Sequence, residues 1–286
     1  MNIDQDTGLS TETNGYQNET ANSSNPFIAD VIKRCSLRQN TTVEHSITLR
    51  DNLENKKITF SMLVQLTNER PQEDNGVVRY LIIGGWAREL LLQAEALEPL
   101  DPRISLTTCL VSSVSNFPIP PHGDVDYLSM TPEDLMTRSI WETYQTDGGK
   151  SSAPVRLLYA NDFSRRASGT NQPDPGALEK YCCRVKVHGH EFIVPRPEVL
   201  FLEYASYKRA SVSASSSGYE IGKDWPEDRN SFNWANFLIE LNKKYSFDID
   251  FLENTRKELV EIGKRKNKSG IKELNEFGYL DIDPVN

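Results

Sequence analysis

The distribution of apolar and polar positions divides the chain into three parts. Residues 1–25 are rich in Asn, Thr, Ser and Gln and hold almost no large apolar side chain, so we expect a disordered tail. Residues 26–200 combine short β-branched runs with amphipathic segments, which predicts an α+β core with helices at its start. Residues 201–286 hold apolar positions at helical spacing and predict a helical C-terminal region.

Helices are expected at the start of the core. Asn25 and Pro26 provide a cap and a first helical residue for a short helix over 26–35. The apolar spacing of residues 56–69 also favours a helix, although a short apolar run of this kind is ambiguous. The polar stretch 70–76 then predicts a loop.

The middle of the chain holds a buried strand that runs directly into a helix. Residues 77–83, VVRYLII, are mostly β-branched or aromatic and predict the strand. Gly84 and Gly85 close it. Residues 86–98, WARELLLQAEALE, then place apolar side chains on one face of a helix, which prolines end beyond residue 98.

The remaining elements complete a sheet with helices around it. The pattern predicts strands over 124–130 and 155–160, a hairpin over 181–195 that turns at His188–Gly189, and helices over 131–144, 196–211, 224–245 and 248–268. We therefore expect an α+β fold in which a mixed β-sheet is flanked by helices and followed by a helical C-terminal part.

Composition and charge narrow the class of protein. No run approaches the ~18 apolar residues that span a bilayer, and the N-terminus lacks the segments of a secretory signal, so we expect a cytoplasmic protein without a membrane partner. The net charge of −9 argues against a general nucleic-acid binder. Residues 150–209 nevertheless hold 10 basic against 6 acidic side chains, which fits either a basic face near a phosphate site or an ordinary mixed surface.

The cysteines and histidines have structural interpretations. The cysteines lack the spacing of a zinc site or a disulfide framework and are interpreted as small buried side chains: Cys35, Cys109, Cys182 and Cys183. His188 and His190 are interpreted as surface residues of the hairpin turn, because no third metal ligand stands nearby. His122 precedes the aspartates and is interpreted as a loop residue, with contact to a substrate as the alternative.

Two carboxylates one residue apart are the strongest candidates for chemistry. Asp124 and Asp126 lie on the strand predicted over 124–130, so both side chains point to one face, roughly 6.6 Å apart along the strand. Carboxylate oxygens on one face suit hard divalent cations such as Mg²⁺. A two-metal site can activate an attacking oxygen and neutralise a leaving pyrophosphate.

The glycines offer the complementary half of such a site. Gly84 and Gly85 at a strand-to-helix junction let the backbone approach a phosphate, and the helix N-terminus offers free N–H groups. Neither pattern is specific alone, since D-x-D also occurs at Asp248–Asp250 and Asp281–Asp283 without a glycine-ended strand upstream. Together the glycines and Asp124–Asp126 predict a nucleotidyl-transfer site.

This combination resembles the polymerase-beta superfamily of nucleotidyltransferases, whose members carry G-G or G-S after an apolar residue and D-x-[DE] on the next strand. The stretches IIGGWAREL and GDVDYLS match that pattern. Two later stretches, HGHEFIVPRPEVLFLEYASYK and GKDWPED, are similar to motifs of small bacterial toxin-type and abortive-infection-type members. The likeness covers about residues 78–230 and implies a nucleotidyltransferase-type mixed sheet that binds an NTP with Mg²⁺.

The resemblance also implies roles for individual residues. Gly84 and Gly85 would hold the triphosphate, and Asp124 and Asp126 would bind the metal ions. The further residues implied are Lys208 as a phosphate contact, Asp224 with Glu227 or Asp228 as orienting acids, and Asp162 or Glu191 as a third catalytic carboxylate.

Two features near the glycines leave alternatives open. Arg88, in the first turn of the glycine helix, is interpreted either as a further phosphate contact or as an arginine paired with glutamates. Between Gly85 and Asp124 lie 38 residues, more than is usual in the family. We therefore expect an insertion within residues 86–123 that serves as a lid, a surface hairpin or a partner site.

The function expected from this site is transfer of a nucleoside monophosphate from an NTP to an acceptor hydroxyl, with release of pyrophosphate. The acceptor is RNA such as tRNA, a partner protein or a small molecule, and the enzyme is of the toxin or defence type. One alternative is a catalytically inactive nucleotide-binding or interaction module on the same fold. Another is an unrelated α/β protein in which the glycines and the aspartates lie far apart.

Overall fold

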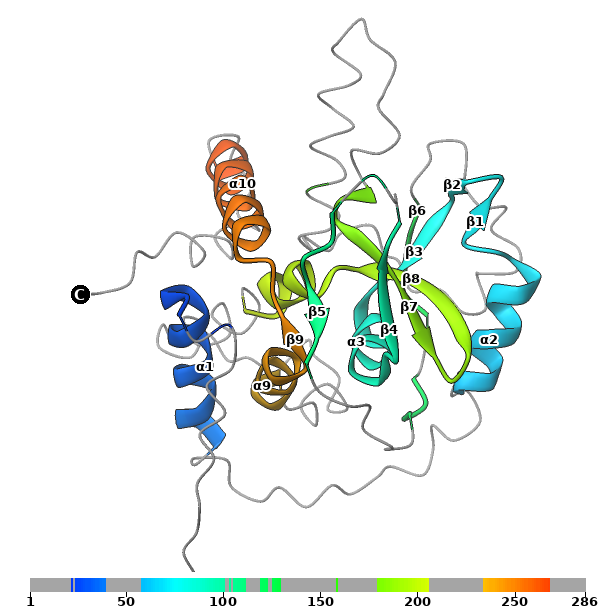
Figure 1. Cartoon of the computed structure of the whole chain (residues 1–286), viewed down its shortest axis with the longest axis horizontal. Helices are drawn as coiled ribbons and strands as arrows, with labels where there is room; N and C mark the ends of the chain where they lie inside the picture. The colour runs from blue at the N-terminus through cyan, green and yellow to red at the C-terminus, as the bar shows by residue number, and fades with distance from the viewer. Residues whose placement is uncertain are drawn as a thin grey trace, which may run out of the picture.

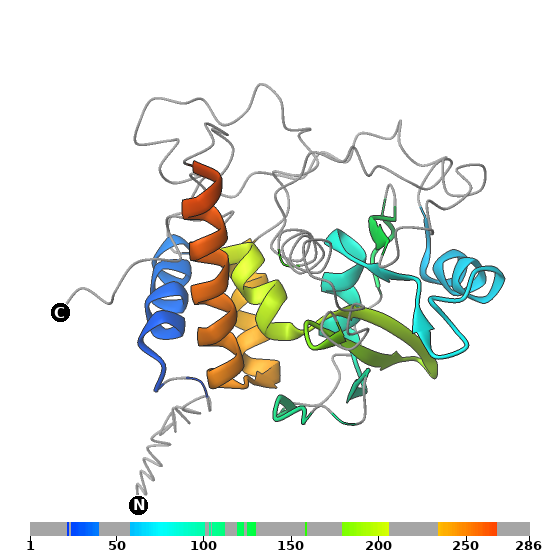
Figure 2. The same ribbon diagram turned by 90° about the horizontal axis from the view of Figure 1, so that it is seen from above.

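The computed structural model describes residues 22, 24–39, 58–100, 103, 105–111, 119–122, 125–129, 158, 179–205 and 234–267. These residues form helices and short β-sheets, which confirms the α+β class. Most strands gather at one end of the molecule together with α2 and α3, whereas α1, α9 and α10 gather at the opposite end and β5 and β9 lie beside α9 (Figures 1 and 2). All strand pairings within the described ranges are antiparallel, so the expected mixed sheet is not seen there.

A β-hairpin forms the centre of the sheet β4-β7-β8. Strands β7 (Cys182–Val187) and β8 (His190–Pro195) pair along their whole length, and His188 (φ 48°) and Gly189 (φ 80°) form the turn. Two successive residues with positive φ match the twist of a two-residue hairpin, so the predicted hairpin is confirmed. Strand β4 (Ala96–Pro99) pairs with β7.

The strand that precedes the glycines belongs to a separate two-stranded sheet. Strand β3 (Tyr80–Ile82) is fully buried and pairs with β6 (Tyr127–Ser129). The side-chain amide of Gln72 links β3 to the larger sheet, since its Nε2 donates to the Tyr80 carbonyl at 3.3 Å and to the Ile193 carbonyl at 2.8 Å, and its oxygen accepts from the Ile193 N–H at 2.9 Å. Helix α3 (Gly84–Gln93) follows β3 at once and packs against β7 and β8.

Helices at the other end of the molecule come from both ends of the chain. They are α1 (Pro26–Gln39), the helix of residues 197–205, α9 (Trp234–Lys244) and α10 (Ile249–Asn267). The Asn25 side chain accepts from the Ile28 N–H at 3.0 Å, which confirms the predicted cap of α1. Two short strands, β5 (Cys109–Leu110) and β9 (Tyr245–Ser246), pair beside them. None of the helices in the described ranges combines the length and apolar character needed to span a bilayer.

The N-terminal part differs from two expectations. Asn22, within the stretch expected to be a tail, is fully buried and bonded to Asn242, Tyr245 and Phe247. Helix α1, expected at the start of the core, packs against α9 and so belongs with the C-terminal helices. Both contacts join segments far apart in the chain, which a local pattern cannot reveal.

The stretch before β3 contains more structure than expected. Helix α2 (Phe60–Glu69) falls within the predicted range and is capped by Thr59, whose hydroxyl accepts from the Met62 N–H at 3.4 Å. The expected loop over 70–76 holds β1 (Glu73–Asp74), which turns at Asn75–Gly76 to pair with β2 (Val77–Val78). The pair Asn-Gly is itself a hairpin signal that the loop prediction overlooked.

Two further segments differ from their predicted class. The helix expected over 86–98 ends at Gln93, because residues 96–99 pair with β7 instead. Leu158, in the middle of the strand expected over 155–160, is helical and buried. A short apolar run fits either class, and tertiary contacts decide between them.

Candidate functional site

A glycine turn connects β3 to α3. Ile83 is extended and follows the last residue of the strand. Gly84 then has φ +64°, a left-handed conformation that residues other than glycine rarely adopt. The cap position Ile83 offers no side-chain hydrogen bond to the start of α3. The first N–H groups of this ten-residue helix therefore lie beside a turn that only glycine accommodates well.

The carboxylate of Asp126 lies directly on this turn. A Cβ atom added at Gly84 would stand 2.5 Å from Asp126 Oδ2, so any other residue at position 84 would collide with it. The Ile83 N–H also donates to the Asp126 carbonyl at 2.9 Å. The glycine stretch and the aspartate strand are thus in contact, which excludes the alternative in which they lie far apart.

His122 lies on the second glycine. A Cβ atom at Gly85 would stand 2.9 Å from His122 Nδ1, and the imidazole ring packs against Trp86 at a centroid distance of 4.8 Å. Burial, followed by the nearby positive charge of Arg88, lowers the pKa of His122 to about 4. The imidazole is therefore neutral near pH 7. The interpretation of His122 as a loop residue missed this contact. Its signal in the sequence is Gly85, where the absence of a side chain leaves room for the imidazole ring.

Arg88 faces the protein interior rather than open solvent. Its guanidinium donates to Glu89 Oε1 through Nε at 2.9 Å and through Nη2 at 2.8 Å. It also forms a hydrogen bond with Tyr204, whose pKa is raised by burial. Of the two sequence interpretations of Arg88, these contacts agree with the pairing to a glutamate. The bond to Tyr204 also joins α3 to the helix of residues 197–205.

Most of the other expected site residues lie outside the described ranges. These are Asp124, Asp162, Lys208, Asp224, Glu227 and Asp228. Glu191, the alternative third carboxylate, lies on β8 with its side chain 59% exposed and 3.7 Å from Arg184 Nη1. Arg184 also pairs with Glu73 at 2.5 Å, so Glu191 takes part in an ion-pair cluster between two hairpins.

The residues around Asp126 fit a hard cation only in part. Among the described residues, no three His, Cys, Asp or Glu side chains gather as a metal-binding group. Asp126 contributes carboxylate oxygens, the donor type that Mg²⁺ prefers, beside a turn with no Cβ atom to fill the space. Its expected partner, Asp124, is beyond these ranges.

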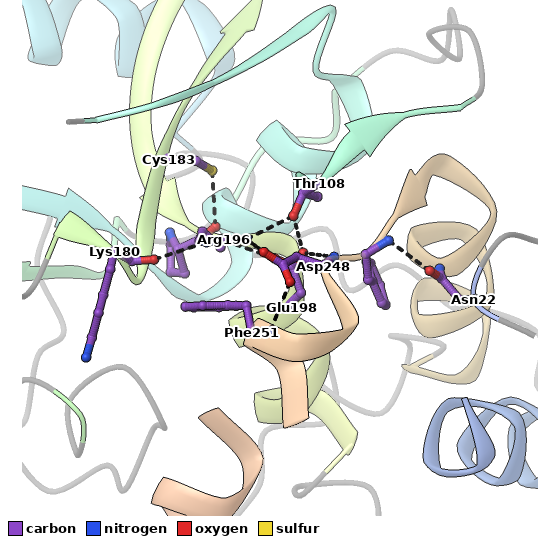
Figure 3. A network of polar contacts seen from close by, with 10 residues as sticks. Asn22, Thr108, Lys180, Cys183, Arg196, Glu198, Asp248 and Phe251 are labelled. Atoms are coloured by element: carbon purple, nitrogen blue, oxygen red, sulfur yellow. Dashed lines mark hydrogen bonds and ion pairs between the residues drawn. The ribbon is translucent and has the colours of Figure 1, made fainter. Parts of the chain in front are cut away.

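The charged residues of the V-P-R-P-E stretch, Arg196 and Glu198, belong to a buried network rather than to the glycine site (Figure 3). Arg196 donates to Glu198 at 3.3 Å, to Thr108 at 3.0 Å and to Asp248 at 3.5 Å, and stacks on the Phe251 ring. Thr108 donates to Glu198, and Asp248 caps α10 by accepting from the Phe251 N–H at 2.9 Å. This network fixes the junction between β8, the 197–205 helix and α10.

The positions of three of the four cysteines and of both hairpin histidines agree with the predictions from sequence. Cys35, Cys182 and Cys183 are buried, and burial raises the pKa of Cys182 to about 12, while Cys109 is exposed. His188 and His190 both contact the Phe60 ring edge to face at the tip of the hairpin. A thiol with a raised pKa is a poor nucleophile, so the cysteine pair on β7 offers no covalent chemistry.

Comparison with known proteins gives no relative. No family model, no curated protein and no solved structure matches the chain. The function therefore has to be inferred from the chain's own residues and contacts.

Proposed function

We propose that this protein is a Mg²⁺-dependent nucleotidyltransferase that moves a nucleoside monophosphate from an NTP to an acceptor hydroxyl and releases pyrophosphate. The observation that carries this proposal is the contact of the Asp126 carboxylate with Gly84 at the first turn of α3. It brings a carboxylate, a glycine pair and a helix N-terminus into one small region. The likeness of both stretches to polymerase-beta superfamily motifs supports the same function.

Each part of this region has a task in the proposed reaction. The glycine backbone and the free N–H groups of α3 bind the triphosphate, whose negative charge a helix N-terminus favours. Asp124 and Asp126 would hold Mg²⁺, which when bound neutralises charge on the triphosphate and the leaving pyrophosphate. Lys208, Asp224 and a third acid, Asp162 or Glu191, complete the proposed set.

The reaction forms one P–O bond and breaks another. The acceptor oxygen attacks the α-phosphorus in line with the pyrophosphate, and the hydroxyl proton passes to a base or to solvent. Positioning and charge compensation supply most of the acceleration in such a transfer. The excess of basic side chains over residues 150–209 favours a phosphate-rich acceptor such as tRNA.

The test is transfer of label from α-³²P-labelled NTPs with Mg²⁺ to total tRNA, to proteins and to small hydroxylated molecules. Wild type is expected to label one of these acceptors, and Asp126→Asn to lower the rate by on the order of 100-fold, because a neutral side chain no longer compensates the cation. Asp250→Asn is the matched control, since Asp250 belongs to the D-I-D sequence at the start of α10. Equal labelling by wild type and Asp126→Asn would contradict the proposal.

A second candidate is an inactive nucleotide-binding module on the same fold. The pairing of Glu191 with Arg184 favours it, because this acid is then not free to act as the third carboxylate. Mg²⁺-dependent binding of NTPs to wild type without transfer to any acceptor would favour this candidate over the enzyme.

A further inference from the structure

His122 has a backbone position that is fixed independently of its ring. Its N–H donates to the Ile58 carbonyl at 3.0 Å, and its carbonyl accepts from the Ile58 N–H at 2.6 Å. This isolated antiparallel bridge ties the segment 119–122 to the residue that precedes the cap of α2. The ring of His122 therefore approaches α3 from a fixed backbone.

The ring then fills a space that only glycine leaves open. An added Cβ atom at Gly85 would stand 2.9 Å from Nδ1, closer than real Cβ contacts, and 3.1 Å from Cε1, which is tighter than most of them. Trp86 closes the other side of the ring and is itself buried. Within the described part of the chain, His122 Nε2 is buried without a hydrogen bond and lies 3.9 Å from Glu89 Oε1, so packing holds the ring more than polar contacts do.

Asp126 repeats this arrangement one residue earlier in α3. Its carboxylate lies on Gly84 as the imidazole of His122 lies on Gly85. His122 and Asp126 therefore each place a side chain against one glycine of the turn. Because Gly84 and Gly85 are adjacent, the two side chains contact neighbouring parts of the same backbone.

We propose that His122 is a positioning residue of the proposed active site: its ring, seated on Gly85 and Trp86, holds the Asp126 carboxylate where it binds a divalent cation beside the glycine turn. This inference rests on the proposed nucleotidyltransferase function. It also explains why two glycines stand in sequence, since each accommodates one side chain of the segment 122–126. The long stretch between Gly85 and this segment is then tolerated, because contacts rather than chain length set the geometry.

The test is binding of Mn²⁺, used as the probe cation, to the full chain, measured by the electron paramagnetic resonance signal of the unbound ion. His122→Ala is expected to weaken Mn²⁺ binding about tenfold, as loss of a residue that orients a metal ligand does. His122→Phe, which keeps a ring on Gly85, is expected to retain binding within about twofold of wild type, well short of that loss. His190→Ala, at the hairpin turn, is the control and should bind as wild type.

A double-mutant cycle separates positioning from plain destabilisation. Gly85→Ala pushes the ring outwards and should weaken Mn²⁺ binding about as much as His122→Ala, while the double variant should lose no more than either single variant. Melting temperatures identify any variant that fails to fold. If His122→Ala does not fold, the comparison of His122→Phe with Gly85→Ala still tests the positioning role. Losses that multiply in the double variant, or equal losses in His122→Ala and His122→Phe, overturn the inference.

Failure of the proposed function gives a different result from failure of this inference. Wild type that neither binds Mn²⁺ nor labels an acceptor refutes both. Wild type that binds Mn²⁺, with His122→Ala binding equally well in folded protein, refutes the positioning role alone.

Discussion

At the scale of single residues, Lys244 is an ammonium group buried at the end of α9. The residue is only 4% exposed, and its Nζ has no hydrogen-bond partner among the described residues. Burial lowers its pKa from 10.5 to about 8. The folded protein therefore binds this proton more weakly than the unfolded chain does.

The expected consequence is a stability that rises with pH between about 8 and 10.5, because only the unfolded chain holds the proton in that window. Below pH 8 both states are protonated, and the full cost of burying the charge, on the order of 3 kcal/mol, remains. Lys244→Met should therefore raise the free energy of unfolding at pH 7 by about 1–3 kcal/mol and abolish the rise at high pH.

Urea unfolding of wild type and Lys244→Met at pH 7 and pH 10 measures both effects. Lys243→Met is the matched control, because the Lys243 side chain is 58% exposed and should change stability by less than about 0.5 kcal/mol. If Lys244→Met were less stable than wild type at pH 7, another group would have to compensate the charge of the Lys244 ammonium group.

At the scale of secondary-structure elements, the network around Arg196 joins segments that share no sheet. Arg196 follows β8, Glu198 lies in the next helix, Thr108 precedes β5 and Asp248 begins α10. Arg196 is 2% exposed and Glu198 is fully buried. A buried ion pair of this kind adds little net stability, but removal of one member leaves an uncompensated charge.

Arg196→Ala should therefore lower the free energy of unfolding by about 3–5 kcal/mol. Arg184→Ala serves as the control, since Arg184 forms its ion pairs at a partly exposed position and should cost about 1 kcal/mol or less. Chemical denaturation of the three proteins tests the difference. Equal losses in the two variants would mean that Glu198 finds another partner when Arg196 is removed.

Some secondary-structure elements could be predicted from the sequence and others could not. The hairpin at His188–Gly189 was predictable because both strands and the turn lie within one short stretch. Strand β4 was not, because its partner β7 lies far along the chain, with Ala96 opposite Lys186. A helical pattern over residues 86–98 carries no trace of that distant pairing.

The candidate site divides in the same way. The proximity of Gly84 to Asp126 was predictable because an apolar strand ending in G-G and a later D-x-D form a motif, although 38 residues separate Gly85 from Asp124. The seating of His122 on Gly85 and the orientation of Arg88 towards Glu89 were not, since both depend on packing between elements. The residues of a motif are readable from sequence, whereas the side chains that hold the motif in place are not.

At the scale of the whole molecule, Asn22 joins the two ends of the described chain. Its side chain donates to Asn242 Oδ1 at 2.9 Å and to the Tyr245 carbonyl at 2.8 Å, and it accepts from the Phe247 N–H at 2.8 Å. These bonds occupy the turn between α9 and α10.

Asn22→Ala should lower the free energy of unfolding by about 2–3 kcal/mol, because it leaves buried backbone groups of Tyr245 and Phe247 without partners. Thermal unfolding measures the loss. Ser24→Ala, at an exposed position two residues away, is the control and should unfold as wild type does. Indistinguishable melting of Asn22→Ala would indicate that water replaces the amide.

The packing of α1 on α9 has a consequence for biosynthesis. On the ribosome α1 emerges long before residues 234–244 are translated, so the helix that carries the buried side chains Phe27, Ile28 and Val31 lacks its contact with α9. The helical end of the protein can close only after α9 has been translated. Nascent chains stalled before α9 are therefore expected to be bound by chaperones at α1, and premature termination there should yield a fragment that proteases remove.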